Sequence, residues 1–309
     1  MELADIPTVD FRDFLAGEPE RSRFVAALGE GLERFGFVFV LGHGIDDELL
    51  ARTYARAQEL FALPEEVKRR YETPHDGRQR GYTSFGVEHA KDRRVADLKE
   101  FWHVGRVLPA DHPLTTSGEI PRNQHAEEAP GFAETAQALF DALDRFSQGL
   151  LAAIELHLGM VEGSFAALTR DGNSVLRIIH YPPLPDEVPA DAVRAAEHED
   201  INLITILPAS TEPGLQLRTR EGQWLEVAPP PGAMVCDTGD MMQLLTHGRL
   251  PATTHRVVNP PAQERRSRYS MPLFCHPHPD GVLRPAGEGQ PAITARDFLM
   301  ERLRDIGLA

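Results

Sequence analysis

Two histidines and one aspartate have the types and the spacing of a metal site. His198 and Asp200 lie two residues apart, and His255 follows after a long run of strand-like segments. Because alternate residues of a strand point to the same face, the imidazole at 198 and the carboxylate at 200 project together, while Glu199 turns away. A second imidazole, from His255, completes three ligands on one side of a metal. Two neutral imidazoles and one carboxylate, with the remaining positions open, are typical of mononuclear non-haem Fe(II) sites.

An isolated His-x-Asp pair is also common by chance, so the metal site depends on the sequence around it. Short motifs follow one another along the second half of the chain: LRIIHYPP at 176–183, HED at 198–200, PGLQL at 213–217, WLEV at 224–227, PGAMV at 231–235, TGD at 238–240, THRVVNP at 254–260 and RYS at 268–270. The first half adds IPTVDF at 6–11, GFVFV at 36–40, GHGI at 42–45 and LPEE at 63–66.

With these motifs the chain resembles the isopenicillin N synthase-like family of iron- and 2-oxoglutarate-dependent dioxygenases along essentially its whole length. The resemblance implies a mainly β core with flanking helices, namely a double-stranded β-helix (a cupin-like jelly roll) preceded by an N-terminal α/β region. It predicts one catalytic unit over residues 1–309, with an N-terminal dioxygenase region at 1–120, a jelly-roll core at 170–280 that binds Fe(II) and 2-oxoglutarate, and a C-terminal helix at 294–309. A terminal helix often covers the site in this family, and the sequence leaves open whether this one does.

The resemblance also implies an activity. Fe(II) is held by His198, Asp200 and His255, and 2-oxoglutarate and O2 occupy the open positions. Oxidative decarboxylation of 2-oxoglutarate to succinate and CO2 then drives oxidation of a small-molecule substrate, usually its hydroxylation. The metal and the cosubstrate supply the difficult chemistry, while the protein supplies orientation and a dry pocket.

The distal carboxylate of 2-oxoglutarate requires a cation and hydroxyl donors. Arg268 and Ser270 share one face of a strand, and the planar guanidinium suits a carboxylate. Tyr181 matches the family tyrosine that bonds the same group. From the residues alone, Arg268 in the basic run 264–268 reads as a surface ion pair. The resemblance instead favours Arg268 as the cosubstrate residue and leaves Arg265 and Arg266 in solvent.

Residues 81–104 correspond to a region that forms the mouth of the active site in relatives. Tyr82, Phe85 and Phe101 are therefore candidate substrate contacts, although aromatic residues of this kind are also common in cores. His276 and His278 alternate with prolines, and we expect a solvated strand end there rather than a metal site.

Composition limits the possible partners and the compartment. The net charge of −15 argues against nucleic acid, which normally requires a basic surface. The two cysteines, Cys236 and Cys275, lie in apolar runs and are expected to be buried thiols in a reducing cytoplasm. No signal-peptide or membrane-spanning stretch is visible. We expect a soluble, cytoplasmic monomer or weak homo-oligomer.

Hydrophobic spacing predicts the elements that position these residues. Apolar residues recur at helical spacing from Phe24 to Phe35, an apolar strand follows at 37–41, and a second helix spans 47–61. A long helix is expected to end near Gly159. Beyond Val175, short strands separated by Gly and Pro turns indicate a sandwich or barrel. Thr294 can cap a terminal helix whose apolar face is formed by Phe298, Leu299, Leu303 and Ile306.

Two other functions remain open at this level. One is an oxidase of the same fold that uses no 2-oxoglutarate, as in isopenicillin N synthase and aminocyclopropane carboxylate oxidase; the Arg268-x-Ser270 pair does not separate these, because both relatives also carry it. The other is a non-catalytic protein that binds a small acid, against which the intact set of site residues counts. The substrate is not determined, because fold does not set function.

Overall fold

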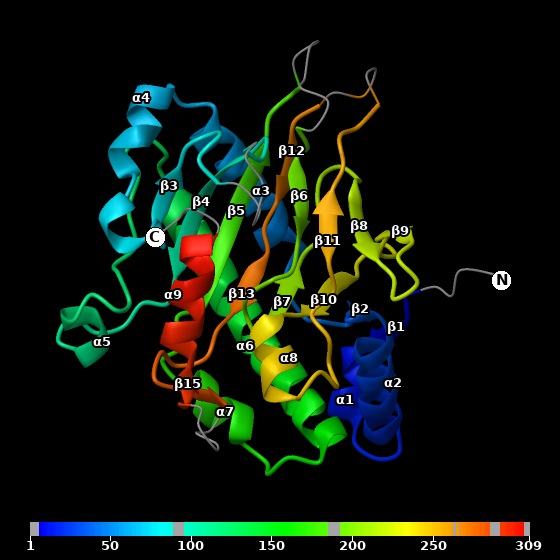
Figure 1. Cartoon of the computed structure of the whole chain (residues 1–309). Coiled ribbons are helices and arrows are strands. Elements are labelled where there is room, and N and C mark those ends of the chain that lie inside the picture. The colour runs from blue at the N-terminus through cyan, green and yellow to red at the C-terminus, as the bar shows by residue number, and fades with distance from the viewer. Residues whose placement is uncertain are drawn as a thin grey trace.

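Two β-sheets with a shared apolar interior form the centre of the molecule, as the computed structural model shows (Figure 1). The structure describes residues 6–88, 96–184, 192–261, 264, 266–284 and 291–305. Eight strands of the large sheet follow the order β1 (Thr8–Asp10), β2 (Phe37–Leu41), β10 (Met234–Thr238), β7 (Ile204–Leu207), β13 (Leu273–Cys275), β5 (Val175–Tyr181), β4 (Glu100–Gly105) and β3 (Gly81–Thr83), and β12 (Arg268–Ser270) also pairs with β5.

The small sheet has the order β6 (Ala195–His198), β11 (His255–Val257), β8 (Leu215–Arg218) and β9 (Trp224–Glu226). Its pairs are antiparallel, and His255 of β11 lies opposite His198 of β6. Apolar side chains from both sheets meet in one buried cluster, including Phe39 and Ile179 from the large sheet and Leu217 from the small one. This is the double-stranded β-helix that the sequence predicted, and the N-terminal strands β1 to β4 extend its large sheet. A separate two-stranded sheet joins β14 (Val282–Arg284) and β15 (Ile293–Thr294).

The helices pack mainly against the large sheet. Helix α6 (Phe132–Leu158) is the longest of the described helices, and its apolar face belongs to the larger core cluster (Figure 1). In the described part of the chain, no helix has both the length and the apolarity needed to cross a membrane. The other helices are α1 (Phe11–Ala16), α2 (Glu20–Phe35), α3 (Asp47–Phe61), α4 (Glu65–Lys68), α5 (Pro113–Thr116), α7 (Ser164–Thr169), α8 (Asp240–Leu245), α9 (Ala295–Asp305) and the 3-10 turns η1 (Arg69–Tyr71) and η2 (Pro74–Asp76).

Local signals explain most of these boundaries. Helix α2 ends where Gly36 adopts a left-handed conformation (φ +66°) and bonds back to the carbonyl of Leu32. Asp46 starts α3, because its side chain accepts from the Glu48 N–H at 3.0 Å. The predicted helices at 24–35 and 47–61 and the strand at 37–41 are confirmed. Strand β10 ends at Thr238 and α8 begins at Asp240, so Gly239 alone connects them.

Strand β12 determines where the predicted cosubstrate residues point. It pairs with β5, so that Arg268 lies opposite Tyr181 and Ser270 lies opposite Ile179. Arg268 and Ser270 are buried, while Tyr269 between them is only half-buried. The two side chains therefore share the inner face of the sheet, as their spacing predicted. Arg265 lies outside the described residues, and the side chain of Arg266 is 75% exposed.

A buried polar network ties the outer strands of the large sheet to α4. Glu100 of β4 accepts from Lys68 at 2.7 Å and lies 2.7 Å from the Nδ1 atom of His180. The hydroxyl of Tyr82 bonds to the same carboxylate. Burial by itself raises the pKa of Glu100, but the hydrogen bonds from His180, Lys68 and Tyr82 outweigh it and lower that pKa. Glu100 is therefore ionised, and it relies on Lys68 as its cation.

Replacing Lys68 by methionine leaves this buried carboxylate without its cation. We expect the free energy of unfolding to fall by roughly 3 to 5 kcal/mol, because removing one member of a buried pair strands the other charge. Urea unfolding followed by circular dichroism measures the change. The matched control is Arg69→Met, because Arg69 and its partner Glu65 are 58% and 59% exposed. The control should lose less than about 1 kcal/mol, and equal losses in the two variants would contradict the account.

Candidate active site

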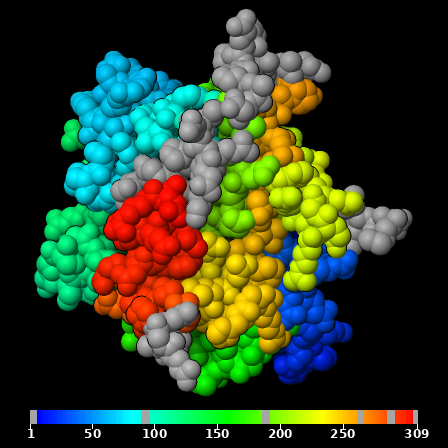
Figure 2. All heavy atoms as spheres, in the orientation of Figure 1, coloured from blue at the N-terminus to red at the C-terminus, as the bar shows by residue number. Residues whose placement is uncertain are grey.

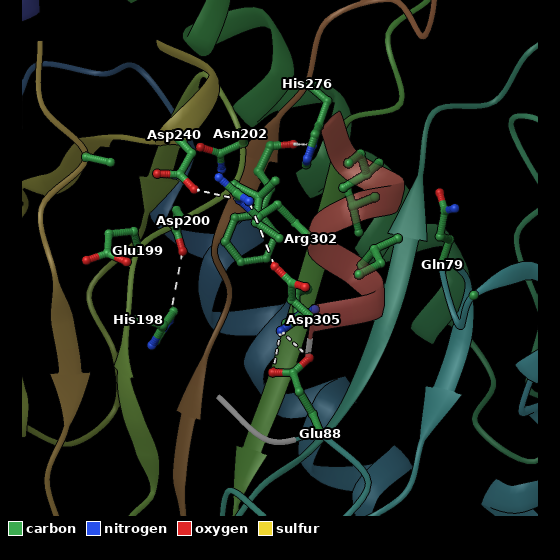
Figure 3. Close-up of a pocket in the computed structure, with 18 of the residues that line it drawn as sticks. Gln79, Glu88, His198, Glu199, Asp200, Asn202, Asp240, His276, Arg302 and Asp305 are labelled. Carbon is green, nitrogen blue, oxygen red and sulfur yellow. Dashed lines mark hydrogen bonds and ion pairs between the residues drawn. The ribbon is translucent and has the colours of Figure 1, made fainter. Parts of the chain in front are cut away.

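His198, Asp200 and His255 meet at one end of the β core. One ligand atom from each lies within 4.8 Å of the other two. The Nε2 atoms of His198 and His255 are 3.9 Å and 3.7 Å from Oδ1 of Asp200. In Figure 3, His198 and Asp200 point toward each other, whereas Glu199 is directed away from them. His198 at the end of β6, Asp200 in the segment that follows it and His255 of β11 thus converge with a spacing that suits a single divalent ion.

Both imidazoles are oriented by backbone carbonyls. Nδ1 of His198 is 2.7 Å from the carbonyl oxygen of Ala196, and Nδ1 of His255 is 3.1 Å from that of Thr253. A carbonyl can only accept, so each Nδ1 carries the proton and each Nε2 lone pair faces Asp200. Burial, and then the neighbouring His198, lower the pKa of His255 to about 4. His255 is therefore neutral at physiological pH, as a metal ligand must be.

Asp200 is fixed from its other side. Its Oδ2 atom accepts from the hydroxyl of Thr205, which in turn accepts from Asn202 at 2.9 Å. Burial and the negative charge of Asp200 raise the pKa of Asp237 well above its ordinary value, which disfavours a second anion beside Asp200. A single carboxylate therefore faces the two imidazoles with its rotamer restrained.

An inner cavity extends from these three residues between the two sheets. Tyr181, Arg268 and Ser270 line it, together with His198, Asp200 and His255. Arg268 is 2% exposed; its Nε donates to the carbonyl of Glu212 at 2.9 Å and its Nη2 to Ser210 at 2.8 Å. Its Nη1 atom is buried and has no hydrogen-bond partner among the described residues. The guanidinium lies 5.0 Å from the ring centroid of Tyr181, and the hydroxyl of Ser270 is 3.3 Å from that of Ser210.

A larger cavity of about 720 Å³ opens on the other side of His198 and Asp200. Both of these residues line both cavities, so the two cavities meet at the cluster. Many polar side chains form the wall of the large cavity. Figure 3 labels Gln79, Glu88 and His276 among them, and Lys99, His103, Asn173 and Arg177 also line it.

Two family models match the chain. Residues 6–128 match the model of the N-terminal region of non-haem dioxygenases in morphine synthesis, and residues 172–277 match the 2OG-Fe(II) oxygenase superfamily. The 2-oxoglutarate-Fe(II) type oxidoreductase hxnY of Emericella nidulans is 31% identical over 95% of this chain and 88% of its own length. The chain belongs to the 2OG-Fe(II) oxygenase superfamily.

Solved structures agree with this oxygenase over nearly their whole length. A 2OG-Fe(II) oxygenase family protein from Caulobacter crescentus is 39% identical, with a TM-score of 0.86 over 98% of this chain and 100% of that one. A full-length Neurospora crassa protein in complex with alpha-KG is 27% identical, with a TM-score of 0.82 over 96% and 95%. The protein is a non-haem Fe(II), 2-oxoglutarate-dependent dioxygenase, and Fe(II), 2-oxoglutarate and O2 are its cofactor and cosubstrates.

The C-terminal helix contributes to the active-site cavity of the oxygenase. Leu299, Arg302, Leu303 and Asp305 of α9 line the large cavity. Nε of Arg302 lies 3.2 Å from Oδ2 of Asp240, the first residue of α8, and its guanidinium lies 4.7 Å from the ring centroid of Phe298. Figure 2 shows the red helix on the surface beside the yellow segment that contains α8. The terminal helix thus closes one side of the site, a point that the sequence alone did not decide. Ile306, which was predicted for the apolar face of this helix, lies outside the described residues.

The three aromatic residues predicted to contact substrate do not line either cavity. Tyr82 is 1% exposed and bonds to Glu100 in the network described above. Phe85 is 47% exposed at the surface. Phe101 is buried in the inter-sheet cluster, where its ring centroid lies 4.2 Å from the guanidinium of Arg177. Phe101 contacts Arg177, which lines both cavities, so it supports their wall from behind.

His276 corrects a second expectation. It is not at a solvated strand end: it is 8% exposed, it lines the large cavity, and burial lowers its pKa to about 4. Its N–H bonds to Ser174 at 3.2 Å directly after β13, so the chain turns inward at this point. His278, two residues later, is half-buried outside the cavity wall.

Sequence reasoning missed the charged groups of the cavity wall. Lys99 lies 2.6 Å from Glu88 and 2.8 Å from Asp97, and Nη1 of Arg177 donates to Glu88 at 3.0 Å. Nε of Arg177 donates to His103 at 2.7 Å. A signal was present, because Arg177 is the one arginine or lysine in the apolar strand 175–181. Such a residue is rarely buried unless it is paired.

Loss of the Asp200 carboxylate should abolish tight metal binding. For Asp200→Ala we expect the affinity for Fe(II), measured by anaerobic calorimetry, to fall more than about 100-fold, because even an outer-shell partner is worth roughly 10- to 100-fold. Glu199→Ala is the control, because Glu199 is adjacent in sequence but bonds to Thr254 instead. Wild-type affinity in Asp200→Ala would exclude the three-residue cluster as the metal site.

Proposed function

We propose that His198, Asp200 and His255 hold the Fe(II) and that Arg268, Ser270 and Tyr181 receive 2-oxoglutarate in the inner cavity. The observation that carries this assignment is the buried Nη1 atom of Arg268, which has no partner among the described residues. An orphaned guanidinium nitrogen is costly in a dry interior, and a carboxylate is the ligand that its planar fork fits best.

The charge around Arg268 supports an anionic ligand. Among the described residues, no carboxylate lies within ion-pair distance of its guanidinium, whose bonds go to a carbonyl and a hydroxyl. Lys99 and Arg177, by contrast, both have carboxylate partners. A fully buried cation without a counter-charge is stabilised when a ligand brings one. The dicarboxylate 2-oxoglutarate would place its distal group here and leave its 2-oxo acid end at the metal cluster.

Bound Fe(II) and 2-oxoglutarate supply the oxidising chemistry, in which 2-oxoglutarate is converted to succinate and CO2. The residues of the chain orient the bound groups and shield them from water. The aromatic face of Tyr181 keeps the Arg268 guanidinium in one plane, and the hydroxyls of Ser210 and Ser270 offer further hydrogen bonds to a carboxylate. Since His198 and Asp200 also face the large cavity, a substrate bound there meets the metal from the open side.

The substrate we propose is a small, polar molecule that is oxidised in the large cavity, most simply by hydroxylation. The volume of about 720 Å³ and the many hydrogen-bonding groups of the wall support this. The Neurospora crassa relative has also been solved with alpha-KG and thymine, which is a molecule of this kind. Substrate-dependent succinate formation over a panel of small polar compounds that includes thymine tests the proposal. Stimulation by bulky apolar compounds alone would contradict it.

We also propose that the chain acts as one catalytic unit, in the cytoplasm, as a monomer or weak homo-oligomer. Strands β1 to β4 lie in the same sheet as the metal-binding core, which supports a single unit over the predicted regions 1–120 and 170–280. Cys236 and Cys275 are free and buried, as expected of thiols in a reducing compartment. Size-exclusion chromatography with light scattering tests the oligomeric state, and a stable dimer or larger species at micromolar concentration would contradict it.

The cosubstrate assignment predicts a selective loss of 2-oxoglutarate binding in Arg268→Ala. With Fe(II) under anaerobic conditions, 2-oxoglutarate at about one hundred times its dissociation constant should stabilise the wild type by roughly 2.7 kcal/mol. The shift in thermal unfolding should disappear in Arg268→Ala, because the buried cation is gone.

Arg266→Ala is the matched control, because Arg266 lies two residues earlier and its side chain is 75% exposed. It should keep the full shift. An undiminished shift in Arg268→Ala would refute the assignment. An absent shift in the wild type with iron bound would instead indicate the oxidase that uses no 2-oxoglutarate.

A further inference from the structure

Strand β6 carries the metal ligand His198 at an exposed position. His198 is the last residue of β6, an edge strand of the small sheet, and its side chain is 34% exposed. The side chain of His255 is only 11% exposed, and its ring packs edge-on against Phe37 at 5.7 Å. Since packing restrains His198 less than His255, its orientation depends more on the hydrogen bond from Nδ1 to the carbonyl of Ala196.

The carbonyl of Ala196 binds His198, and the N–H of the same residue is bound by a buried carboxylate. The N–H of Ala196 donates to Oδ1 of Asp97 at 3.0 Å. On one edge, strand β6 pairs with β11 through His255 and Val257, with a shift of register between these two residues. Along its free edge, β6 is met by the segment around Asp97, where the Leu98 N–H also bonds to the carbonyl of Val193 at 3.1 Å. Asp97 thus takes the place of a neighbouring strand beside the metal ligand.

Asp97 is itself fixed by a buried ion pair. Its Oδ2 atom accepts from Lys99 at 2.8 Å, and Asp97 and Lys99 are 4% and 6% exposed. Lys99 also binds Glu88, which is shared with Arg177. Burial opposes charge on Lys99, but Glu88 and Asp97 outweigh it and raise the Lys99 pKa, so the ammonium is retained. A carboxylate clamped in this way has little freedom to release the Ala196 backbone.

We propose that Asp97 is a positioning residue for the metal: through the Ala196 backbone it holds His198 in the orientation that presents Nε2 to the iron. The proposal rests on the proposed function, in which His198 is a ligand. Asp97 does not touch the metal cluster, so its effect passes through a backbone amide and carbonyl. This role would also explain why Asp97 is paired with Lys99, because a buried ion pair by itself often adds little to the stability of the fold.

The test is metal affinity rather than turnover. Anaerobic titration with Co(II), whose visible absorption reports coordination geometry, is made on the wild type, Asp97→Leu and Asp97→Asn. Asp97→Leu should weaken Co(II) binding roughly 10- to 100-fold and change the spectrum, because the outer-shell support of a ligand is lost. Asp97→Asn keeps an acceptor for the Ala196 N–H and should bind within a few-fold of the wild type.

Asp144→Leu is the control for general destabilisation. Asp144 forms a comparable, largely buried pair with Arg106 at 2.9 Å, and it lies on α6 outside both cavities. Its variant should lose stability without losing Co(II) affinity. Should Asp97→Leu fail to fold, Asp97→Glu replaces it, because the charge is kept while the carboxylate moves by one methylene away from its fixed position.

Each outcome distinguishes the two proposals. A wild type that binds no Co(II) refutes the metal site itself. A wild type that binds, together with Asp97→Leu or Asp97→Glu that bind equally well with an unchanged spectrum, overturns the role of Asp97 and leaves the metal site intact. An affinity lost equally in Asp97→Leu and Asp97→Asn also overturns it, because the acceptor at position 97 would then not be what holds His198.

Discussion

The site depends on two hydrogen bonds from imidazole Nδ1 atoms to backbone carbonyls close by in the chain. His198 bonds to Ala196 and His255 to Thr253, each two residues earlier. These bonds fix the tautomer and direct both Nε2 lone pairs toward Asp200. Because β6 and β11 pair with His255 opposite His198, the ring centroids lie 4.4 Å apart. The jelly roll supplies this pairing, and the two cavities and α9 are arranged around it.

The cations that line the two cavities differ in whether a carboxylate neutralises them. The chain carries a net charge of −15, so attraction of an anionic cosubstrate must be local. Lys99 and Arg177 are neutralised by Glu88 and Asp97 in the wall of the large cavity. Arg268, at 2% exposure, is more deeply buried than either of them and is bonded only to neutral groups among the described residues. In the proposed assignment, the distal carboxylate of 2-oxoglutarate would supply the counter-charge that Arg268 lacks among the described residues.

Much of the fold and of the candidate site could be predicted where the interacting residues are close together in the sequence. The His-x-Asp spacing indicated that His198 and Asp200 lie together, although Asp200 lies just beyond the end of β6. Strand alternation placed Arg268 with Ser270, and helical spacing with glycine caps placed α2 and α6. Contacts between distant segments were not predictable in this way. Tyr82, one candidate for substrate contact, bonds to Glu100, and His276, which was expected at a solvated strand end, lines the large cavity together with α9. Asp97, Ser210 and the wall position of Arg177 depend on how loops dock on strands, which a single sequence does not encode as a pattern.

The most direct test of the account is an anaerobic visible-absorption titration of the Fe(II)-loaded wild type with 2-oxoglutarate. Chelation of Fe(II) by the 2-oxo acid end produces a metal-to-ligand charge-transfer band, which requires open positions on the metal. A cation that binds the distal carboxylate sets the concentration at which the band saturates. We expect a saturable band with 2-oxoglutarate, and much weaker saturation with pyruvate, which lacks the distal carboxylate for Arg268. Tight Fe(II) binding without any band, or equal saturation by pyruvate, would contradict it.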